Sequence, residues 1–322
     1  MNEVPIPTPS GLEADDPLVR KLLVAARLPF LTASVLPAVA ATAAVWRLEG
    51  SLRAGRAALA IVGVGLLHAG ANLANDFFDH LSGDDAGNRA VTPFSGGSRV
   101  IQEGVLSARA VLAASLACLA AGTACGLALW RATGGHGVLL LGLAGLAIGW
   151  AYTAPPLQLS HRGLGELGVF AAFGPLPAMG VEYVQRGAFS LEGSWVGVPA
   201  GLLVAAILVV NEFPDVEADA AAGKRHLVAR LGRRRAVALY ELLVAGAYAA
   251  VAAGVLAGWM PPAALAVALV APLSCRAIGV LRAHYADVRA MLPAQAATIA
   301  QQAVFLLLLT GAYLADLGLD AW

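Results

Sequence analysis

The chain has 322 residues, of which 59% are hydrophobic and only 13% are charged, and its formal net charge is zero. A soluble domain carries about 25% charged residues, so this composition excludes a soluble globule and predicts a polytopic α-helical membrane protein in a lipid bilayer. The zero net charge gives no electrostatic case for a nucleic-acid partner. The three cysteines lie in apolar runs without a Cys-x-x-Cys pair, so we expect buried small side chains there rather than a metal site or a disulfide.

We divide the chain into a disordered cytoplasmic tail over residues 1–20 and a single transmembrane domain over residues 21–322. The first 17 residues are polar and contain prolines, and they lack the apolar segment of a cleavable signal. Apolar stretches of about 20 residues, the length that spans a bilayer, predict nine helices, at 28–47, 57–79, 108–130, 137–154, 164–185, 195–213, 236–257, 262–282 and 297–316. No soluble domain fits between them.

Lys and Arg residues indicate which side of the membrane each loop occupies. With the N-terminus inside, sixteen of the 21 Lys and Arg residues fall in inside segments and five in outside segments, and cytoplasmic loops are enriched in these residues. We therefore predict a cytoplasmic N-terminus in a bacterial-type inner (cell) membrane. In this orientation the polar helix ends at Asp79, Tyr152 and Asp219 all face the cytoplasm.

Polar and acidic residues end the second predicted span, in the stretch Asn72-Leu-Ala-Asn-Asp-Phe-Phe-Asp79. Its polar members share one helical face: Asn72, Asn75, Asp76 and Asp79. Ionisable groups within a membrane-spanning segment are energetically costly, and they indicate a functional site by default. Asp76 and Asp79 are i,i+3 neighbours, so their carboxylates can share a cation and repel each other without one. Asp85 follows in a turn that can bring it to the same place.

A second acidic stretch, Asn211 to Asp219, ends the sixth predicted span. Asn211, Asp215 and Asp219 are spaced i, i+4 and i+8 on one helical face, and Pro214 predicts a kink or helix end between them. Mg²⁺ takes oxygen ligands and is usually bound through one or two carboxylates plus substrate phosphates. We therefore predict a Mg²⁺ site with five candidate ligands, Asp76, Asp79, Asp85, Asp215 and Asp219.

Basic residues and a glycine-rich turn follow the two acidic motifs. Arg89 and Arg99 flank the turn Ser95-Gly-Gly-Ser98, and Lys224 and Arg225 come shortly after Asp219. Guanidinium and backbone N–H groups can hold phosphate oxygens. Carboxylates, Mg²⁺ and basic residues beside a membrane cavity fit a polyprenyl diphosphate. The alternative is that the acidic residues only pair with Arg or Lys at helix ends.

A third polar element begins at Tyr152, at the cytoplasmic end of the fourth span. The ring of Tyr152 can stabilise a cation through its face, and Arg162 can meet a diphosphate or an acidic acceptor. An interfacial Tyr anchor and a positively charged inside loop explain the same residues equally well.

Three of these patterns resemble the UbiA superfamily of intramembrane aromatic prenyltransferases: Asn75-Asp76-x-x-Asp79, Tyr152-x-x-x-Pro156 and Asp215-x-x-x-Asp219. Within that superfamily, Asn72 to Asp79, Gly163-Leu-Gly-Glu166 and Asp219-Ala-Ala-Ala-Gly-Lys-Arg225 look like the MenA branch, the 1,4-dihydroxy-2-naphthoate polyprenyltransferases of menaquinone synthesis. The resemblance covers nearly the whole chain. It implies a bundle of about nine transmembrane helices around a central cavity.

The resemblance implies Mg²⁺-dependent transfer of a polyprenyl group from polyprenyl diphosphate to an aromatic acceptor, with 1,4-dihydroxy-2-naphthoate as the acceptor of the MenA branch. It implies catalytic roles for Asp76, Asp79, Asp215, Asp219 and Tyr152. It implies substrate-binding roles for Asn72, Asn75, Arg89, Arg99, Arg162, Asn211, Lys224 and Arg225.

The chain departs from the family pattern at three positions. Gly83 stands where the superfamily spacing has an Asp, and Asp85 matches the shifted acid of the MenA branch. Glu212 and Pro214 stand where that branch commonly has Asn and Arg. Two other interpretations fit the residues: a UbiA-type enzyme with another quinone, phenolic or lipid-alcohol acceptor, and a cation-coupled transporter built on paired acidic helix ends.

Overall fold

The computed structural model describes residues 10–13, 15–87 and 92–319, so much of the predicted tail over residues 1–20 lies outside the described residues. The elements named within the described ranges are all helical. Within these ranges, eight helical segments, four of which combine two consecutive named elements, are long and apolar enough to cross a membrane. The shorter apolar helix α6 (Gly137–Ala151) packs beside α3, α5 and α8. The prediction of an all-α integral membrane protein with about nine spans is confirmed.

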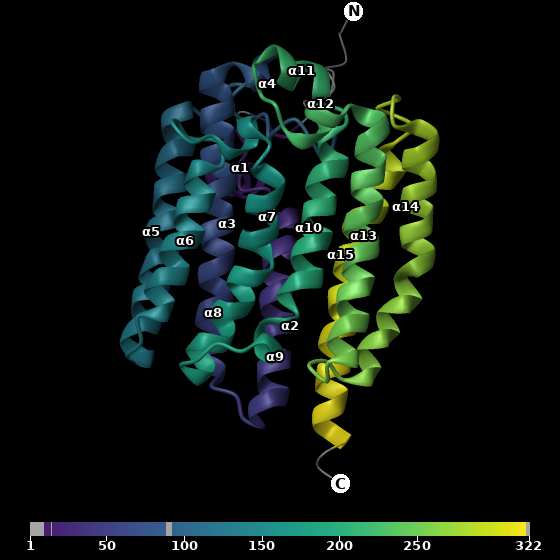
Figure 1. The fold of residues 1–322 in the computed structure, drawn as a ribbon. Helices are drawn as coiled ribbons and strands as arrows, with labels where there is room; N and C mark the ends of the chain where they lie inside the picture. Colours follow the sequence, from purple (N-terminus) through teal and green to yellow (C-terminus); the bar gives the residue numbers. More distant parts are fainter. Residues whose placement is uncertain (1–9, 14, 88–91, 320–322) are drawn as a thin grey trace, which may run out of the picture.

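The long helices run side by side in one bundle (Figure 1). The first part of the chain forms α2 (Thr32–Glu49), α3 (Ala54–Ser82), α5 (Ala108–Thr133), α6, α7 (Gly165–Phe173) and α8 (Pro175–Arg186). The second part forms α9 (Leu191–Ser194), α10 (Gly197–Glu212), α13 (Arg233–Leu256), the 3₁₀ helix η3 (Pro262–Val270), α14 (Ala271–His284) and α15 (Leu292–Leu319). Helix α1 (Leu18–Ala25) and the short 3₁₀ segments η1 (Leu28–Leu31) and η2 (Leu159–Arg162) complete these parts.

Helix α10 lies at the centre of the bundle, because it packs against α7, α13 and α15 and most of its side chains are buried. The outer helices instead expose large apolar side chains, among them Leu140, Leu242, Leu256 and Leu269. A helix satisfies its own backbone hydrogen bonds, so such a surface is stable in lipid. The core therefore sits around α10, and the outer face is suited to hydrocarbon.

The predicted continuous span over 164–185 is interrupted in the structure, where α7 ends at Phe173 and α8 begins at Pro175. The break occurs at Gly174, which precedes a proline that cannot donate a helical hydrogen bond. Here the backbone of Gly174 approaches Gly197 and Gly201 of α10 so closely that no side chain would fit between them. Sequence hydrophobicity did not reveal this break because both halves are apolar.

Three short helices, α4 (Asp84–Gly87), α11 (Val216–Ala221) and α12 (Leu227–Leu231), lie together at one end of the bundle (Figure 1). Helix α3 ends at Ser82 and is followed by Gly83, whose φ of +81° is a left-handed conformation that favours glycine. Helix α10 ends at Glu212, which confirms the helix end predicted at Pro214. These two helix ends bring both acidic motifs to the same end of the bundle.

The close backbone approach at Gly197 gives a test of the fold. A Cβ atom on Gly197 would lie 2.7 Å from the carbonyl oxygen of Gly174, so Gly197→Ala should destabilise the protein by about 1–3 kcal/mol through overpacking. Gly311→Ala is the matched control, because a Cβ there meets nothing within 4 Å. Thermal unfolding in detergent should show a lower midpoint for Gly197→Ala alone; equal midpoints would contradict the proposed packing.

Candidate active site

A polar cavity of about 240 Å³ lies between the two acidic motifs. Its lining includes nine predicted site residues, namely Asn72, Asn75, Asp79, Asp85, Tyr152, Asn211, Asp215, Asp219 and Lys224. These residues come from α3, α4, α10, α11 and the segments that follow α6, α10 and α11. Segments more than 130 residues apart in the sequence therefore meet around one space.

Lys224 connects the two acidic motifs across this cavity. Its ammonium nitrogen lies 2.8 Å from a carboxylate oxygen of Asp84 and 3.7 Å from oxygens of both Asp79 and Asp219. Burial alone would lower the pKa of Lys224, but the three carboxylates raise that pKa well above its usual value. The lysine is therefore a fixed positive charge where the motifs converge.

The first motif presents carboxylate oxygens that have no hydrogen-bond partner among the described residues. Asn75 donates its amide to Asp79 Oδ2 at 3.0 Å, whereas Asp79 Oδ1 and Asp84 Oδ1 are buried without a hydrogen bond. An unsatisfied buried oxygen is costly and calls for a ligand, water or ion. Clustered carboxylates of this kind are the ligands that Mg²⁺ prefers, so the residues present fit the predicted metal.

Asp85 lines the cavity against the glycine-rich turn. Its carboxylate accepts a hydrogen bond from Gln102 at 3.0 Å, and a Cβ atom on Gly97 would approach Asp85 Oδ1 to 2.9 Å. Burial, followed by repulsion from Asp79 and Asp76, raises the pKa of Asp85 to about 8. The site thus holds more carboxylates than its own cations can neutralise.

Asp76 does not line the cavity, although the sequence placed it among the metal ligands. It is 2% exposed, forms an ion pair with Arg27 and accepts a hydrogen bond from the Ser98 hydroxyl. Arg27 joins α1 to η1 with a left-handed backbone, φ +53°, which is uncommon for a residue other than glycine. The sequence predicts only an inside charge at Arg27, because nothing in it links this residue to Asp76.

The predicted basic residues other than Lys224 lie away from the cavity or outside the described residues. Arg99 donates to the backbone carbonyl of Asp85, and Arg162 donates to the carbonyl of Pro156 at 2.8 Å. The residues that line the cavity include Arg27 and Lys224 but not Arg99, Arg162 or Arg225. Arg89 falls in the gap at 88–91 and lies outside the described residues.

A side chain of another helix makes a hydrogen bond to the second motif. Gln295 of α15 donates to Asn211 Oδ1 at 3.1 Å, which turns the amide group of Asn211 to a fixed orientation. Tyr152 lines the cavity just past the end of α6, and its carbonyl accepts a hydrogen bond from Ser160 at 2.8 Å. Asp215 also lines the cavity, in the turn between α10 and α11.

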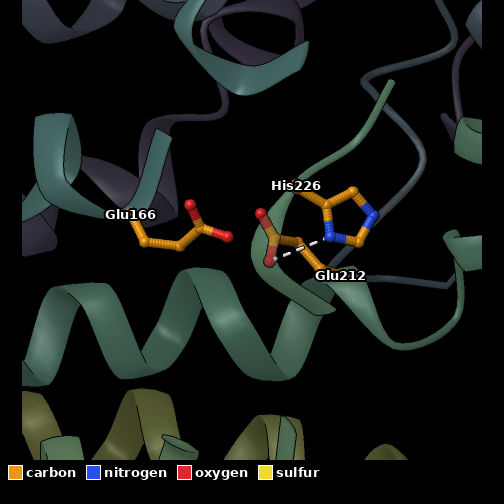
Figure 2. A group of neighbouring side chains, drawn as sticks. All are labelled: Glu166, Glu212 and His226. Atoms are coloured by element: carbon orange, nitrogen blue, oxygen red, sulfur yellow. Dashed lines mark ion pairs between the residues drawn. The ribbon is translucent and has the colours of Figure 1, made fainter. Parts of the chain in front are cut away.

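Sequence analysis gave no site role to three buried residues beside Asp219, which are Glu166, Glu212 and His226 (Figure 2). His226 Nε2 lies 3.0 Å from Asp219 Oδ2, and Nδ1 lies 3.3 Å from Glu212 Oε2. Burial lowers the pKa of His226, but these two carboxylates raise it to about 10. Glu166 and Glu212 lie inside motifs described above, and His226 directly follows Lys224-Arg225. This proximity to predicted site residues was the one sign in the sequence that they belong to the site.

An apolar cavity of about 440 Å³ adjoins the polar one. It is lined by leucines, glycines and other apolar residues of α3, α5, α6 and α8. His68, Gly149 and Phe173 line both cavities, so the two spaces share a wall. The arrangement is a charged chamber at the end of the bundle with an apolar chamber running from it between the helices.

Comparison with known proteins identifies relatives along most of the chain. The model of the UbiA prenyltransferase family matches residues 34–299. The chain is 33% identical over 264 residues to a Mycobacterium tuberculosis protein named 1,4-dihydroxy-2-naphthoate octaprenyltransferase, covering 80% of this chain and 84% of that one. It is 31% identical to the 2-carboxy-1,4-naphthoquinone phytyltransferase of Synechocystis, covering 76% and 77%.

The fold matches solved structures at low sequence identity. A UbiA homolog from Archaeoglobus fulgidus bound to DMAPP and Mg²⁺ superposes with a TM-score of 0.64 at 16% identity, covering 92% of this chain and 99% of that chain. A UbiA homolog from Aeropyrum pernix gives a TM-score of 0.63 at 20% identity, covering 88% and 97%. The overall fold is therefore shared with these membrane proteins.

The ion pair between Arg27 and Asp76 gives a test of the site electrostatics. Arg27→Met leaves the carboxylate of Asp76 without its cation and should destabilise the protein by about 1–3 kcal/mol. Adding Asp76→Asn should recover part of that loss, because the unpaired charge is removed. Thermal unfolding in metal-free detergent of the wild type, the two single variants and the double variant completes this double-mutant cycle.

The exposed pair Arg282–Glu241 provides the control for that cycle. Arg282 is 64% exposed in its side chain, so Arg282→Met should change stability by no more than about 1 kcal/mol. If the stability changes of Arg27→Met and Asp76→Asn were strictly additive in the double variant, the contact between the two residues would contribute no coupling energy.

Proposed function

The chain belongs to the UbiA prenyltransferase family and is an integral membrane prenyltransferase, and we propose that it transfers a polyprenyl group from polyprenyl diphosphate to 1,4-dihydroxy-2-naphthoate. The observation that carries this proposal is the polar cavity with carboxylates from two motifs, joined by a shared wall to an apolar cavity. A diphosphate needs the first chamber and an isoprenoid tail needs the second.

The diphosphate end of the donor would bind in the polar cavity. Asp79, Asp215 and Asp219 supply the carboxylates for Mg²⁺, which when bound supplies the electrostatic neutralisation of the leaving diphosphate. Lys224 adds a fixed positive charge at the same place, and charge stabilisation that is already in position costs little reorganisation during reaction. This arrangement supports ionisation of the allylic C–O bond.

The allylic group would lie where the two cavities meet, shielded from water by apolar side chains. Tyr152 lines the polar cavity, and the face of its ring could stabilise the positive charge. His68 stands in the shared wall, and its Nδ1 lies 2.9 Å from the hydroxyl of Ser34. The tail would extend along the apolar cavity between α3, α5, α6 and α8.

The acceptor is proposed from the names of the relatives, which include naphthoate octaprenyltransferases and a naphthoquinone phytyltransferase. An electron-rich ring would attack the allylic carbon, the diphosphate would leave with the bonding electron pair, and the ring would lose its carboxyl group as carbon dioxide. The side chain of Asn211, held by Gln295, is a hydrogen-bonding group on the acceptor side of the cavity. The cytoplasmic side is proposed for this site from the loop charge bias.

The acidic residues of the cavity provide the direct test. Asp79→Asn and Asp215→Asn should each lower prenyl transfer by at least ~100-fold, because charge stabilisation of the leaving group is lost. Glu217→Gln is the matched control from the same segment, since Glu217 is 68% exposed and pairs with Arg233. The assay measures Mg²⁺-dependent incorporation of labelled prenyl diphosphate into a lipid-soluble product, with a panel of phenolic acceptors.

Full activity in both aspartate variants would rule out the proposed site. Activity with other phenols but none with 1,4-dihydroxy-2-naphthoate would retain the prenyltransferase and replace the acceptor.

If the isoprenoid tail occupies the apolar cavity, the size of this cavity should determine which donor chain lengths bind. Gly145 lines this cavity, and a Cβ atom there meets nothing within 4 Å, so Gly145→Leu should fill open space without disturbing the helices. The ratio of the KM for a long polyprenyl diphosphate to the KM for geranyl diphosphate should rise by about 10-fold or more, since steric misfits in an apolar pocket have effects of this size. Gly311→Leu, in α15 outside this cavity, should leave the ratio unchanged, and an unchanged ratio in both variants would place the tail elsewhere.

A further inference from the structure

Glu166, Glu212 and His226 form a compact cluster of potential metal ligands behind the polar cavity (Figure 2). One ligand atom from each residue lies within 4.8 Å of those of the other two. The three residues come from α7, the end of α10 and the residue before α12. All are at least nine-tenths buried, at 5%, 8% and 0% exposure respectively.

The cluster holds two carboxylates and leaves one of them without a cation. Glu166 Oε1 accepts the backbone N–H of Leu227 at 2.6 Å, whereas Glu166 Oε2 is buried without a hydrogen bond. Figure 2 shows this carboxylate directed at that of Glu212. Two buried carboxylates that face each other require a positive charge between them or a shared proton.

The imidazole of His226 is oriented as in a metal site. Its Nε2 lies 3.0 Å from Asp219 Oδ2, so a proton on Nε2 points away from the cluster. Its Nδ1 faces Glu212 Oε2 at 3.3 Å. Metal-binding histidines commonly hold their second N–H beside a carboxylate, which leaves the other nitrogen as a ligand. Nε2 is buried without a hydrogen bond and lies close enough to Asp219 for this role.

A proton on Nδ1 would serve Glu212 but would leave Glu166 Oε2 unpartnered. A divalent ion serves all three atoms at once. Nδ1 accepts a hydrogen bond from the backbone N–H of Ala229 at 3.3 Å, which caps α12, and a ligated ion would take the place of this bond. The donor set of one imidazole nitrogen and two carboxylates suits a first-row transition ion, whereas Mg²⁺ favours an all-oxygen shell.

We propose that Glu166, Glu212 and His226 bind a divalent transition-metal ion such as Mn²⁺ or Zn²⁺, at a site separate from the carboxylate site of the polar cavity. Glu212 lines that cavity, while Glu166 and His226 do not. The ion would therefore be accessible to water or a ligand oxygen on the side of Glu212. It would also tie α7, α10 and α12 together. The proposal does not depend on the function proposed above.

Mn²⁺ is the probe, because electron paramagnetic resonance detects both its binding and a directly bound imidazole nitrogen. The purified full-length protein in detergent is stripped of metal, given excess Mg²⁺ to occupy the all-carboxylate site, and titrated with Mn²⁺. The expected result is Mn²⁺ retained against Mg²⁺, with a ¹⁴N coupling in the pulsed spectrum. His226→Gln should remove the coupling, and both His226→Gln and Glu166→Gln should weaken Mn²⁺ binding by at least ~10-fold.

Two controls separate this site from its surroundings. His161→Gln changes a half-buried histidine outside the cluster and should leave the ¹⁴N coupling intact. Asp79→Asn alters the polar cavity and should leave it intact as well. Glu166→Gln keeps a carbonyl oxygen to accept the Leu227 N–H, so this variant tests the site if His226→Gln unfolds.

Three outcomes would overturn the proposal. Mn²⁺ that is not retained against Mg²⁺ would show that the two glutamates share a proton instead. Retained Mn²⁺ without ¹⁴N coupling, or a coupling that survives in His226→Gln, would exclude His226 as a ligand. Loss of the coupling in Asp79→Asn would assign the ion to the polar cavity. None of these readouts requires prenyl transfer, so they are independent of a failed activity assay.

Discussion

The balance between buried carboxylates and the few cations among them controls the arrangement at the end of this bundle. Isolated charges are expensive in a low-dielectric interior and must be paired. Lys224 meets the carboxylates of Asp84, Asp79 and Asp219, while Arg27 meets Asp76. These contacts explain why the segments after α3 and α10 fold back as short helices rather than extending into solvent. The negative charge that remains is what the divalent cation proposed for this cavity would neutralise.

The helical scaffold makes this arrangement possible by combining close packing with interrupted helices. Small residues let helices approach each other in lipid, where no hydrophobic force brings them together. At Gly174, Gly197 and Gly201 this approach brings the backbone of the α7–α8 break into contact with α10. As a result, α10 is held at the centre, with Asn211 and Glu212 at its end. The position of the second motif is thus set by packing ten or more residues away from it.

The sequence predicted the helical architecture well because each span needs only length and apolarity. It also predicted the cavity-lining residues Asp79 and Asp215, since the polar side chains shared helical faces at two matching span ends. It did not predict the contact of Asp76 with Arg27, because that partner is 49 residues away and a helical arc of roughly 100° includes residues that turn to a neighbouring segment. It could not find the His226 cluster, because that depends on three segments meeting in space.

Glu212 departs from the MenA sequence pattern, and in the structure it also belongs to the buried cluster with Glu166 and His226. An Asn at this position, as is common in that branch, would be a neutral hydrogen-bonding group at the cavity. A carboxylate there adds a negative charge beside Glu166 and Asp219, and such a charge is stable only with a compensating partner. His226 lies 3.3 Å from Glu212 and 3.0 Å from Asp219, and the ion proposed above would supply the positive charge between Glu212 and Glu166. His226 therefore connects Glu212, which lines the polar cavity, to Asp219, so a change at Glu212 would also alter the charge environment of Asp219.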